Sequence, residues 1–178
     1  VIPSRGGGGA TTVAVNLAVS LAAKMPNHGK TDAGHNRVLL LDLDIQFGNT
    51  GTYVDVEDNG ALVDLLAGNT EPTPERILAA VQKTDHGIDI ITAPTMFVPV
   101  TAMTPDLAGH ILRVLRRHYA YVIIDLPRAA LDWVEPLVKM SNRLVLVSAG
   151  SVPCIRQAKR PVDLFRYLDI DLKIALSM

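Results

Sequence analysis

Four consecutive glycines, Gly6 to Gly9, are the feature that most restricts how this 178-residue chain folds. A short apolar segment, Val1–Ile2, precedes them, and apolar residues recur at helical spacing over residues 11–23. A strand, a glycine turn and a helix in that order allow backbone N–H groups to curl around an anion at the positive end of the helix. The sequence therefore predicts a phosphate-binding loop over residues 5–12. A plain flexible turn is the alternative interpretation of the same glycines.

Apolar runs of strand length alternate with helix-length segments along the chain, which predicts a three-layer α/β fold with a mostly parallel, twisted sheet and helices on both faces. The expected strands are 1–2, 38–41, 88–92, 121–124, 144–147 and 172–176. The expected helices are 11–23, 61–66, 74–82, 105–118, 132–140 and 152–167. Thr73 and Thr104 each stand before a proline and are expected to cap the helices that follow. The polar segment 26–36 is expected to be an exposed loop.

Length and composition indicate one α/β domain over residues 1–178, and both ends of the sequence suggest the middle of a longer protein. The formal net charge of −1 provides no global field for nucleic acid or an anionic membrane. A single cysteine, Cys154, excludes a disulfide within the chain and a cysteine-built metal site. The five histidines have no ligand spacing. With no apolar run long enough to span a bilayer and no signal-peptide pattern, we expect a cytoplasmic protein.

Carboxylates follow two of the predicted strands. Asp42 and Asp44 come at the end of the second strand, and Asp125 ends the apolar run 122–124. The carboxyl ends of parallel strands form the crevice in which open α/β sheets bind ligands. Asp125 is then placed to hold Mg²⁺ through water, together with the hydroxyl of Thr11. Asp42 and Asp44 share a face and are expected at the same site, although both could merely cap the turn.

The glycine loop departs from the usual phosphate-loop pattern at its most important charge. That pattern ends in Gly-Lys-[Ser/Thr], and Ala10 stands at the lysine position. Loss of the ammonium group weakens nucleotide affinity and removes charge stabilisation from phosphoryl transfer. Arg5 is the nearest candidate for compensation, within the chain or across a dimer, and an exposed charge without a ligand is the alternative. The expected nucleotide-binding residues are Gly6, Gly7, Gly8, Gly9, Ala10, Thr11 and Thr12.

Together, the segments 5–12, 42–49 and 125–127 resemble the deviant Walker A ATPases of the ParA/MinD family, whose loop reads Lys-Gly-Gly-x-Gly-Lys-[Ser/Thr]-[Ser/Thr]. The resemblance implies ATP or ADP with Mg²⁺ as cofactors and an ATP-dependent homodimer. By position, Arg5 stands for the signature lysine that reaches the partner's phosphates. Thr11 stands for the Mg²⁺ hydroxyl, Asp44 for the carboxylate that orients the attacking water, and Asp125 for the Walker B acid. The metal set is therefore Thr11, Asp42 and Asp125, and the catalytic set Asp44 and Arg5.

The departures from the family pattern are similar to those of a subgroup, the CpaE/TadZ proteins of Flp (Tad) pilus assembly. The shared features are Ala10 in the loop, the run Asp-Leu-Asp-Ile-Gln-Phe-Gly at 42–48, and Ile-Asp-Leu-Pro-Arg at 124–128 followed by Asp132 and Trp133. That resemblance implies a receiver-like domain before this one, a place at the cell pole on the inner-membrane face, and contacts with pilus and secretion machinery. It makes Ala10 a natural feature, whereas the residues themselves leave open an engineered substitution.

Three functions remain open at this point. The first is a nucleotide-dependent assembly scaffold that hydrolyses ATP slowly or not at all. The second is an active partitioning or septum-positioning ATPase, for which the arginines of 113–117 or 156–166 would have to bind DNA. Solvated helix faces are the favoured interpretation of those arginines. The third is an interaction module that has lost nucleotide binding.

Overall fold

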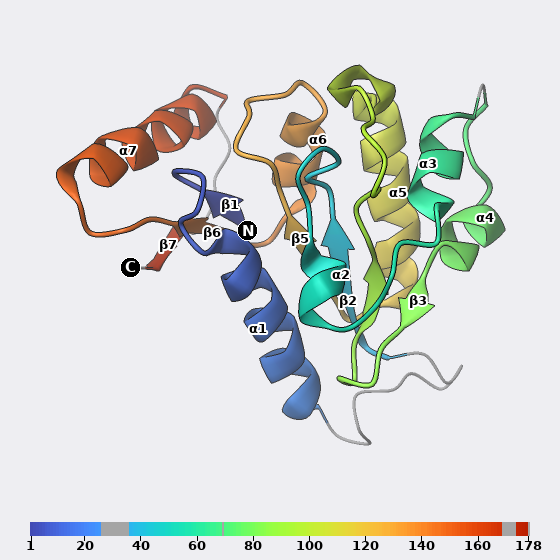
Figure 1. Ribbon diagram of the computed structural model, residues 1–178. Coiled ribbons are helices and arrows are strands. Elements are labelled where there is room, and N and C mark those ends of the chain that lie inside the picture. Colours follow the sequence, from blue (N-terminus) through green and yellow to red (C-terminus); the bar gives the residue numbers. More distant parts are fainter. Residues whose placement is uncertain (26–35, 69, 169–173, 178) are drawn as a thin grey trace.

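Figure 1 shows the chain as a computed structural model, which describes residues 1–25, 36–68, 70–168 and 174–177. The strands are β1 (Ile2–Pro3), β2 (Val38–Asp42), β3 (Gln82–Lys83), β4 (Asp89–Ile91), β5 (Tyr121–Asp125), β6 (Leu144–Val147) and β7 (Ile174–Ser177). The helices are α1 (Ala10–Ala23), α2 (Thr50–Tyr53), α3 (Ala61–Leu66), α4 (Pro74–Ala79), α5 (Pro105–His118), α6 (Val134–Met140) and α7 (Val152–Tyr167). A 3-10 turn, η2, covers Val100–Ala102.

The strands lie in the order β3-β4-β2-β5 and β1-β6-β7. A hydrogen bond from Leu126 N to Val1 O, 3.0 Å long, joins the two groups by placing the start of the chain beside the end of β5. Among the described strands, all pairings are parallel except β3 with β4. The expected α/β fold with a mostly parallel sheet is therefore confirmed, and its parallel strands end at one edge.

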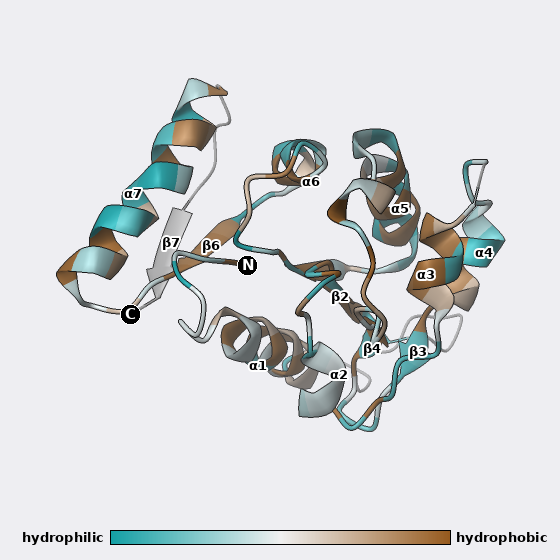
Figure 2. Cartoon of the chain, turned by 45° about the horizontal axis from the view of Figure 1, so that its top comes forward, coloured by the Kyte–Doolittle hydropathy of each residue, from teal (hydrophilic) through white to brown (hydrophobic). Residues whose placement is uncertain are grey.

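Helices cover both faces of the sheet (Figure 2): α1 and α2 lie on one face, and α5, α6 and α7 on the other. The alternation of side chains along β2 divides the core between these layers. Val38 and Leu40 pack with α1, whereas Leu39 and Leu41 pack in the cluster that contains α5 and α6. All four are completely buried, which explains the unbroken apolar run of a strand covered on both faces.

Most predicted elements are present with small changes at their ends. Thr73 and Thr104 cap α4 and α5 as expected, each accepting a hydrogen bond from a backbone N–H of the first turn. The helix expected over 74–82 ends at Ala79, because Gln82 and Lys83 form the antiparallel edge strand β3. The two-residue β3 and the four-residue α2 were not predicted, since both are too short to produce a periodic pattern.

One prediction about the loop 26–36 is wrong. Asn36 is buried, and its Nδ2 donates a hydrogen bond of 2.7 Å to Oδ1 of Asp89 inside the protein. The rest of that segment, 26–35, lies outside the described residues, as do the first two residues of the strand expected over 172–176. Among the helices that the structure describes, none has the length and apolar character needed to cross a bilayer.

Candidate nucleotide site

The glycine loop connects β1 to α1 and is tightly curled. Gly7 and Gly9 have φ angles of 73° and 82°, a left-handed conformation that glycine adopts without strain. The amide of Gly8 donates to Arg5 O at 3.2 Å, and a Cβ on Gly8 would lie 3.0 Å from that oxygen. Gly9 is the N-cap residue of the 14-residue helix α1. A curl of free amides at a helix start is suited to an anion such as phosphate.

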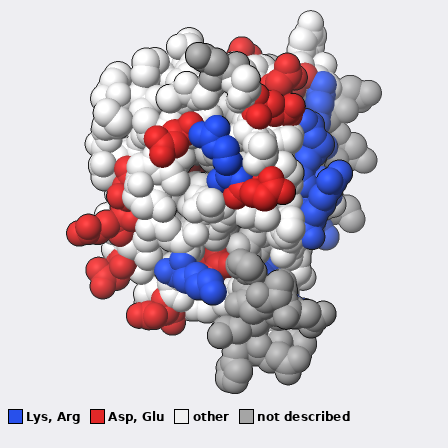
Figure 3. Space-filling view, turned by 90° about the vertical axis from the view of Figure 1, so that its right-hand side faces the viewer, with Lys and Arg blue, Asp and Glu red and all other residues white. Residues whose placement is uncertain are grey.

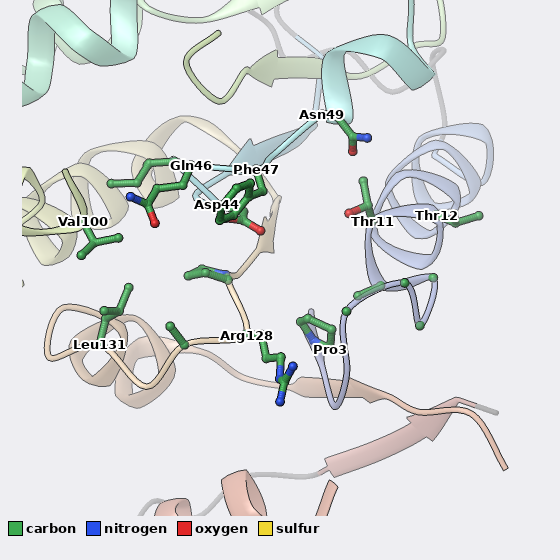
Figure 4. A pocket seen from close by; sticks show the side chains of 18 of the residues that line it. Pro3, Thr11, Thr12, Asp44, Gln46, Phe47, Asn49, Val100, Arg128 and Leu131 are labelled. Carbon is green, nitrogen blue, oxygen red and sulfur yellow. The ribbon is translucent and has the colours of Figure 1, made fainter. Parts of the chain in front are cut away.

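A cavity of about 970 Å³ opens beside this loop (Figure 4). Its first wall consists of the predicted phosphate-binding residues Gly6, Gly7, Gly8, Gly9, Ala10, Thr11 and Thr12. The loop 44–49 after β2 contributes a second wall and residues 127–133 after β5 a third. A volume near the upper end of ordinary small-molecule pockets accommodates a nucleotide. The carboxyl edge of the sheet thus brings together three segments that are far apart in the sequence.

Asp125 and Thr11 meet at the cavity wall: Thr11 lines the cavity, and Asp125 contacts its hydroxyl from behind that wall. The Asp125 side chain is 2% exposed, and burial raises its pKa, while a hydrogen bond with the Thr11 hydroxyl opposes part of that rise. A hydroxyl and a buried carboxylate in contact beside a phosphate-type loop are a suitable oxygen set for Mg²⁺. In the described part of the chain, no cluster of three or more His, Cys, Asp or Glu side chains is arranged to hold a metal. Such a site fits an ion that takes its remaining ligands from phosphates and water.

Asp42 is adjacent to Asp125 across the β2–β5 pairing, and neither residue is part of the cavity lining. One oxygen accepts hydrogen bonds from the amide and hydroxyl of Thr50, and the other accepts one from the amide of Asp44. The side chain is fully buried, and burial raises its pKa to about 7. This carboxylate therefore holds the 44–50 loop, and its role as a metal ligand stays a prediction.

Asp44 lines the cavity and points into it opposite Thr11 (Figure 4). Partial burial raises its pKa, and backbone amides of its own turn oppose the rise. The turn is closed by the amides of Phe47 and Gly48, which donate to Asp44 O at 3.2 and 2.6 Å. Of the two carboxylates Asp42 and Asp44, Asp44 is therefore the one that lines the cavity.

Ala10 and Arg5 occupy different environments. Ala10 is buried and lines the cavity, so the position of the usual lysine is part of the site but carries no charge. Arg5 is exposed and is absent from the described cavity wall. Its guanidinium contacts Cys154 near the start of α7. The pKa of that thiol is lowered mainly by a hydrogen bond with Ser151 and further by Arg5. Within one chain, the structure does not bring Arg5 to the glycine loop's cavity.

The third wall, formed by residues 127–133, was not anticipated. It includes Pro127, Arg128, Leu131 and Trp133, and the buried Trp133 donates from Nε1 to Val100 O at 3.2 Å. The sequence did contain a signal for this wall. Asp125 was predicted to lie at the site, so the loop that follows it was expected to start there. In the structure, Trp133 joins this loop to Val100, which also lines the cavity.

The chain is similar in sequence to a known protein family and to several of its members. The model of the AAA domain family matches residues 1–152. The septum site-determining protein MinD of Bacillus subtilis is 25% identical over 92% of this chain, and that of Thermotoga maritima 24% over 99%. The chromosome partitioning protein ParA of Myxococcus xanthus is 31% identical over 69% of the chain. The chain spans 57% and 62% of the lengths of the two MinD relatives, and 41% of that ParA.

Solved structures share the fold. A ParA family ATPase from Chlorobium tepidum TLS has a TM-score of 0.78 at 20% identity, covering 99% of this chain and 71% of its own. MinD of Pyrococcus horikoshii OT3, solved as a complex with Mg-ADP, has a TM-score of 0.74 at 22% identity, covering 97% and 66%. At these identities the likeness establishes the α/β architecture.

Proposed function

Because this chain belongs to the ParA/MinD family of P-loop ATPases, we propose that it binds ATP or ADP with Mg²⁺ in the cavity beside the glycine loop. The observation that carries the proposal is the contact between the Thr11 hydroxyl and the buried Asp125 carboxylate next to the curled glycines. In this proposal the amides of Gly6 to Thr12 hold the phosphates, and Thr11 and Asp125 hold the metal. Asp42 supports the loop that carries Asp44.

The same site is poorly equipped for turnover. When bound, ATP would supply the phosphoanhydride bond, and the role proposed for Asp44, which lines the cavity, is to orient a water toward it. The methyl group of Ala10 provides none of the positive charge that a lysine would direct at the reacting phosphate. Slow hydrolysis, or none, is therefore the proposed behaviour, which makes the domain a nucleotide-dependent binding module more than an enzyme.

Calorimetry with ATP and Mg²⁺ tests binding directly. The wild-type domain is expected to take up one nucleotide, and Asp125→Asn is expected to lose the part of the affinity that depends on magnesium. A matched control is Asp163→Asn, an exposed carboxylate on α7 away from the cavity, which should bind as the wild type does. Absence of any ATP or ADP uptake by the folded wild-type domain would overturn the proposal and leave an interaction module.

A turnover assay tests the role of Ala10. Ala10→Lys restores the missing charge and is expected to raise the ATPase rate by at least about tenfold, since a single electrostatic contact to a transition state is worth 10²–10³ in the best cases. A wild-type rate already in the ordinary range of about 1–10³ s⁻¹, unchanged by the substitution, would contradict the slow-hydrolysis proposal.

For the cellular role, the proposal is a localisation and assembly factor of a Flp (Tad) pilus secretion system at the cell pole. It would act as a homodimer and associate peripherally with the inner membrane. The support is the CpaE/TadZ-like sequence pattern of residues 5–12, 42–48 and 124–128. Since Arg5 faces α7 and not its own cavity, its proposed place is at the phosphates of the second protomer. Nucleotide-dependent dimerisation measured by light scattering, with Arg5→Ala as the variant, tests that arrangement.

The matched MinD and ParA relatives favour a second candidate, an active partitioning or septum-positioning ATPase. That function requires ATP hydrolysis, and the partitioning role requires DNA binding. The face shown in Figure 3 carries acidic side chains over much of its area and a strip of basic side chains along its right edge. Solvated helix faces are the favoured interpretation of such arginines. A DNA shift assay over a range of salt concentrations separates the two candidates, because a partitioning ATPase binds near physiological salt and a scaffold does not.

A further inference from the structure

Arg128 is the residue that the sequence reasoning left without a role. It follows Asp125 by three positions, in the loop that leaves β5, and it lines the cavity beside the glycine loop. Of the described residues that line this cavity, it alone carries a basic side chain. Arg5, the other candidate cation near the loop, does not reach the cavity wall and contacts Cys154.

The charges of the site require a cation. Asp44 lines the cavity and Asp125 contacts Thr11 of its wall, so two carboxylates already lie at or next to the site. A di- or triphosphate would add several negative charges, of which one Mg²⁺ neutralises only part. In most phosphate loops the lysine provides the next positive charge, and here Ala10 cannot. An uncompensated excess of negative charge in a partly enclosed cavity weakens binding of the nucleotide.

The Arg128 side chain is available for this task. It is exposed, and within the described residues no hydrogen bond or ion pair engages it. Figure 4 shows it beside Pro3, at the same rim of the cavity as the start of the glycine loop, with its guanidinium turned outward. An unengaged arginine changes rotamer at low cost, and its planar group binds phosphate oxygens in pairs.

We infer that Arg128 turns onto the phosphates of the bound nucleotide and replaces the missing loop lysine from the loop after β5. The inference rests on the proposed nucleotide binding and adds the source of the charge. It also explains how a loop with Ala10 retains a nucleotide site: the cation has moved from α1 to the loop after β5.

Equilibrium binding of a phosphate series tests the inference without relying on turnover. ATP, ADP, AMP and adenosine are titrated with Mg²⁺ into the wild type, Arg128→Gln, Ala10→Lys and the Ala10→Lys/Arg128→Gln double variant. Arg117→Gln, which removes an equally exposed arginine from α5, is the matched control. Circular dichroism and thermal unfolding of each variant show that it is folded.

Arg128→Gln is expected to weaken ATP binding by about tenfold or more, the usual size of a lost charge-assisted hydrogen bond, and adenosine binding hardly at all. In the Ala10→Lys background the same change should cost much less, because the restored lysine supplies the charge. Equal ATP affinity of Arg128→Gln and wild type, or an equal loss for ATP and adenosine, would refute the role of Arg128. Failure of the wild type to bind ATP would instead refute the proposed function itself.

Discussion

Thr50 donates two hydrogen bonds to one carboxylate oxygen of Asp42, from its amide at 3.0 Å and from its hydroxyl at 2.8 Å. The other oxygen of Asp42 accepts from the amide of Asp44 at 3.1 Å. This single buried side chain thereby fixes both ends of the 44–50 loop to the end of β2. The cavity wall that carries Asp44 is positioned by a residue that is not itself part of the cavity lining.

Removal of the Thr50 hydroxyl tests this anchoring. Thr50→Val keeps the shape of the side chain but leaves a buried carboxylate short of one donor, and should lower the free energy of unfolding by about 1–3 kcal/mol. Urea denaturation measures the change. Thr52→Val, on the same helix but exposed, is the control and is expected to stay within about 0.5 kcal/mol of the wild type. Equal, small effects of both substitutions would show that the Asp42–Thr50 contact does not hold the loop.

Gly48 is required by close packing. A Cβ at this position would lie 2.4 Å from Oδ1 of Asp42 and 2.6 Å from the Cβ of Ala93. Gly48→Ala is therefore expected to destabilise the domain by roughly 1–3 kcal/mol, the usual cost of overpacking. Gly150→Ala is the control, since a Cβ there has no neighbour within 4 Å. Thermal unfolding of the two variants compares them, and a native-like melting temperature for Gly48→Ala would contradict the packing described.

The stability of the nucleotide-free domain should fall as the pH rises. Burial raises the pKa of Asp42 from 3.8 to about 7. A carboxyl group with a raised pKa in the folded state contributes stability that is complete below the unfolded-state pKa and is lost as the pH rises through the folded-state pKa. The decline is thus expected between about pH 4 and pH 7.

Asp42→Asn isolates that contribution. The variant is neutral at every pH, so its free energy of unfolding, measured in EDTA by urea denaturation at several pH values, should fall less steeply than that of the wild type. Asp44 and Asp125 also have raised pKa values and act in the same direction, so a residual slope is expected. Identical slopes for variant and wild type would mean that Asp42 does not titrate in this range.

A second buried carboxylate lies at the other end of the sheet. Asp89 is fully buried and accepts hydrogen bonds from the Tyr119 hydroxyl at 2.9 Å and from Asn36 at 2.7 Å. Burial, and then the charge of Asp89, raise the pKa of Tyr119, which stays a donor. Tyr119→Phe should cost about 1.5–3 kcal/mol of stability by urea denaturation. The nearby, exposed Tyr121→Phe should cost almost nothing, and a comparable loss there would discount the Tyr119–Asp89 bond.

The sequence by itself determined the layers, the order of the long elements and the place of the glycine loop. Local patterns suffice for these features: an unbroken apolar run such as Val38–Leu41 requires cover on both faces, and a Thr-Pro pair is typical of a helix start. The position of Asp125 after such a run likewise placed it at the carboxyl edge. The absence of lysine at Ala10 was equally visible without any structure.

Tertiary structure alone decided which of these side chains face the cavity. The sequence places Asp42 and Asp44 on the same face. In the structure, the Asp42 carboxylate is buried against Thr50, whereas Asp44 lines the cavity. Arg5 lies next to the glycines but turns to α7, whereas Arg128, more than a hundred residues later in the sequence, lines their cavity. Such choices depend on which distant segment offers a hydrogen bond or a packing partner, and no local spacing encodes that.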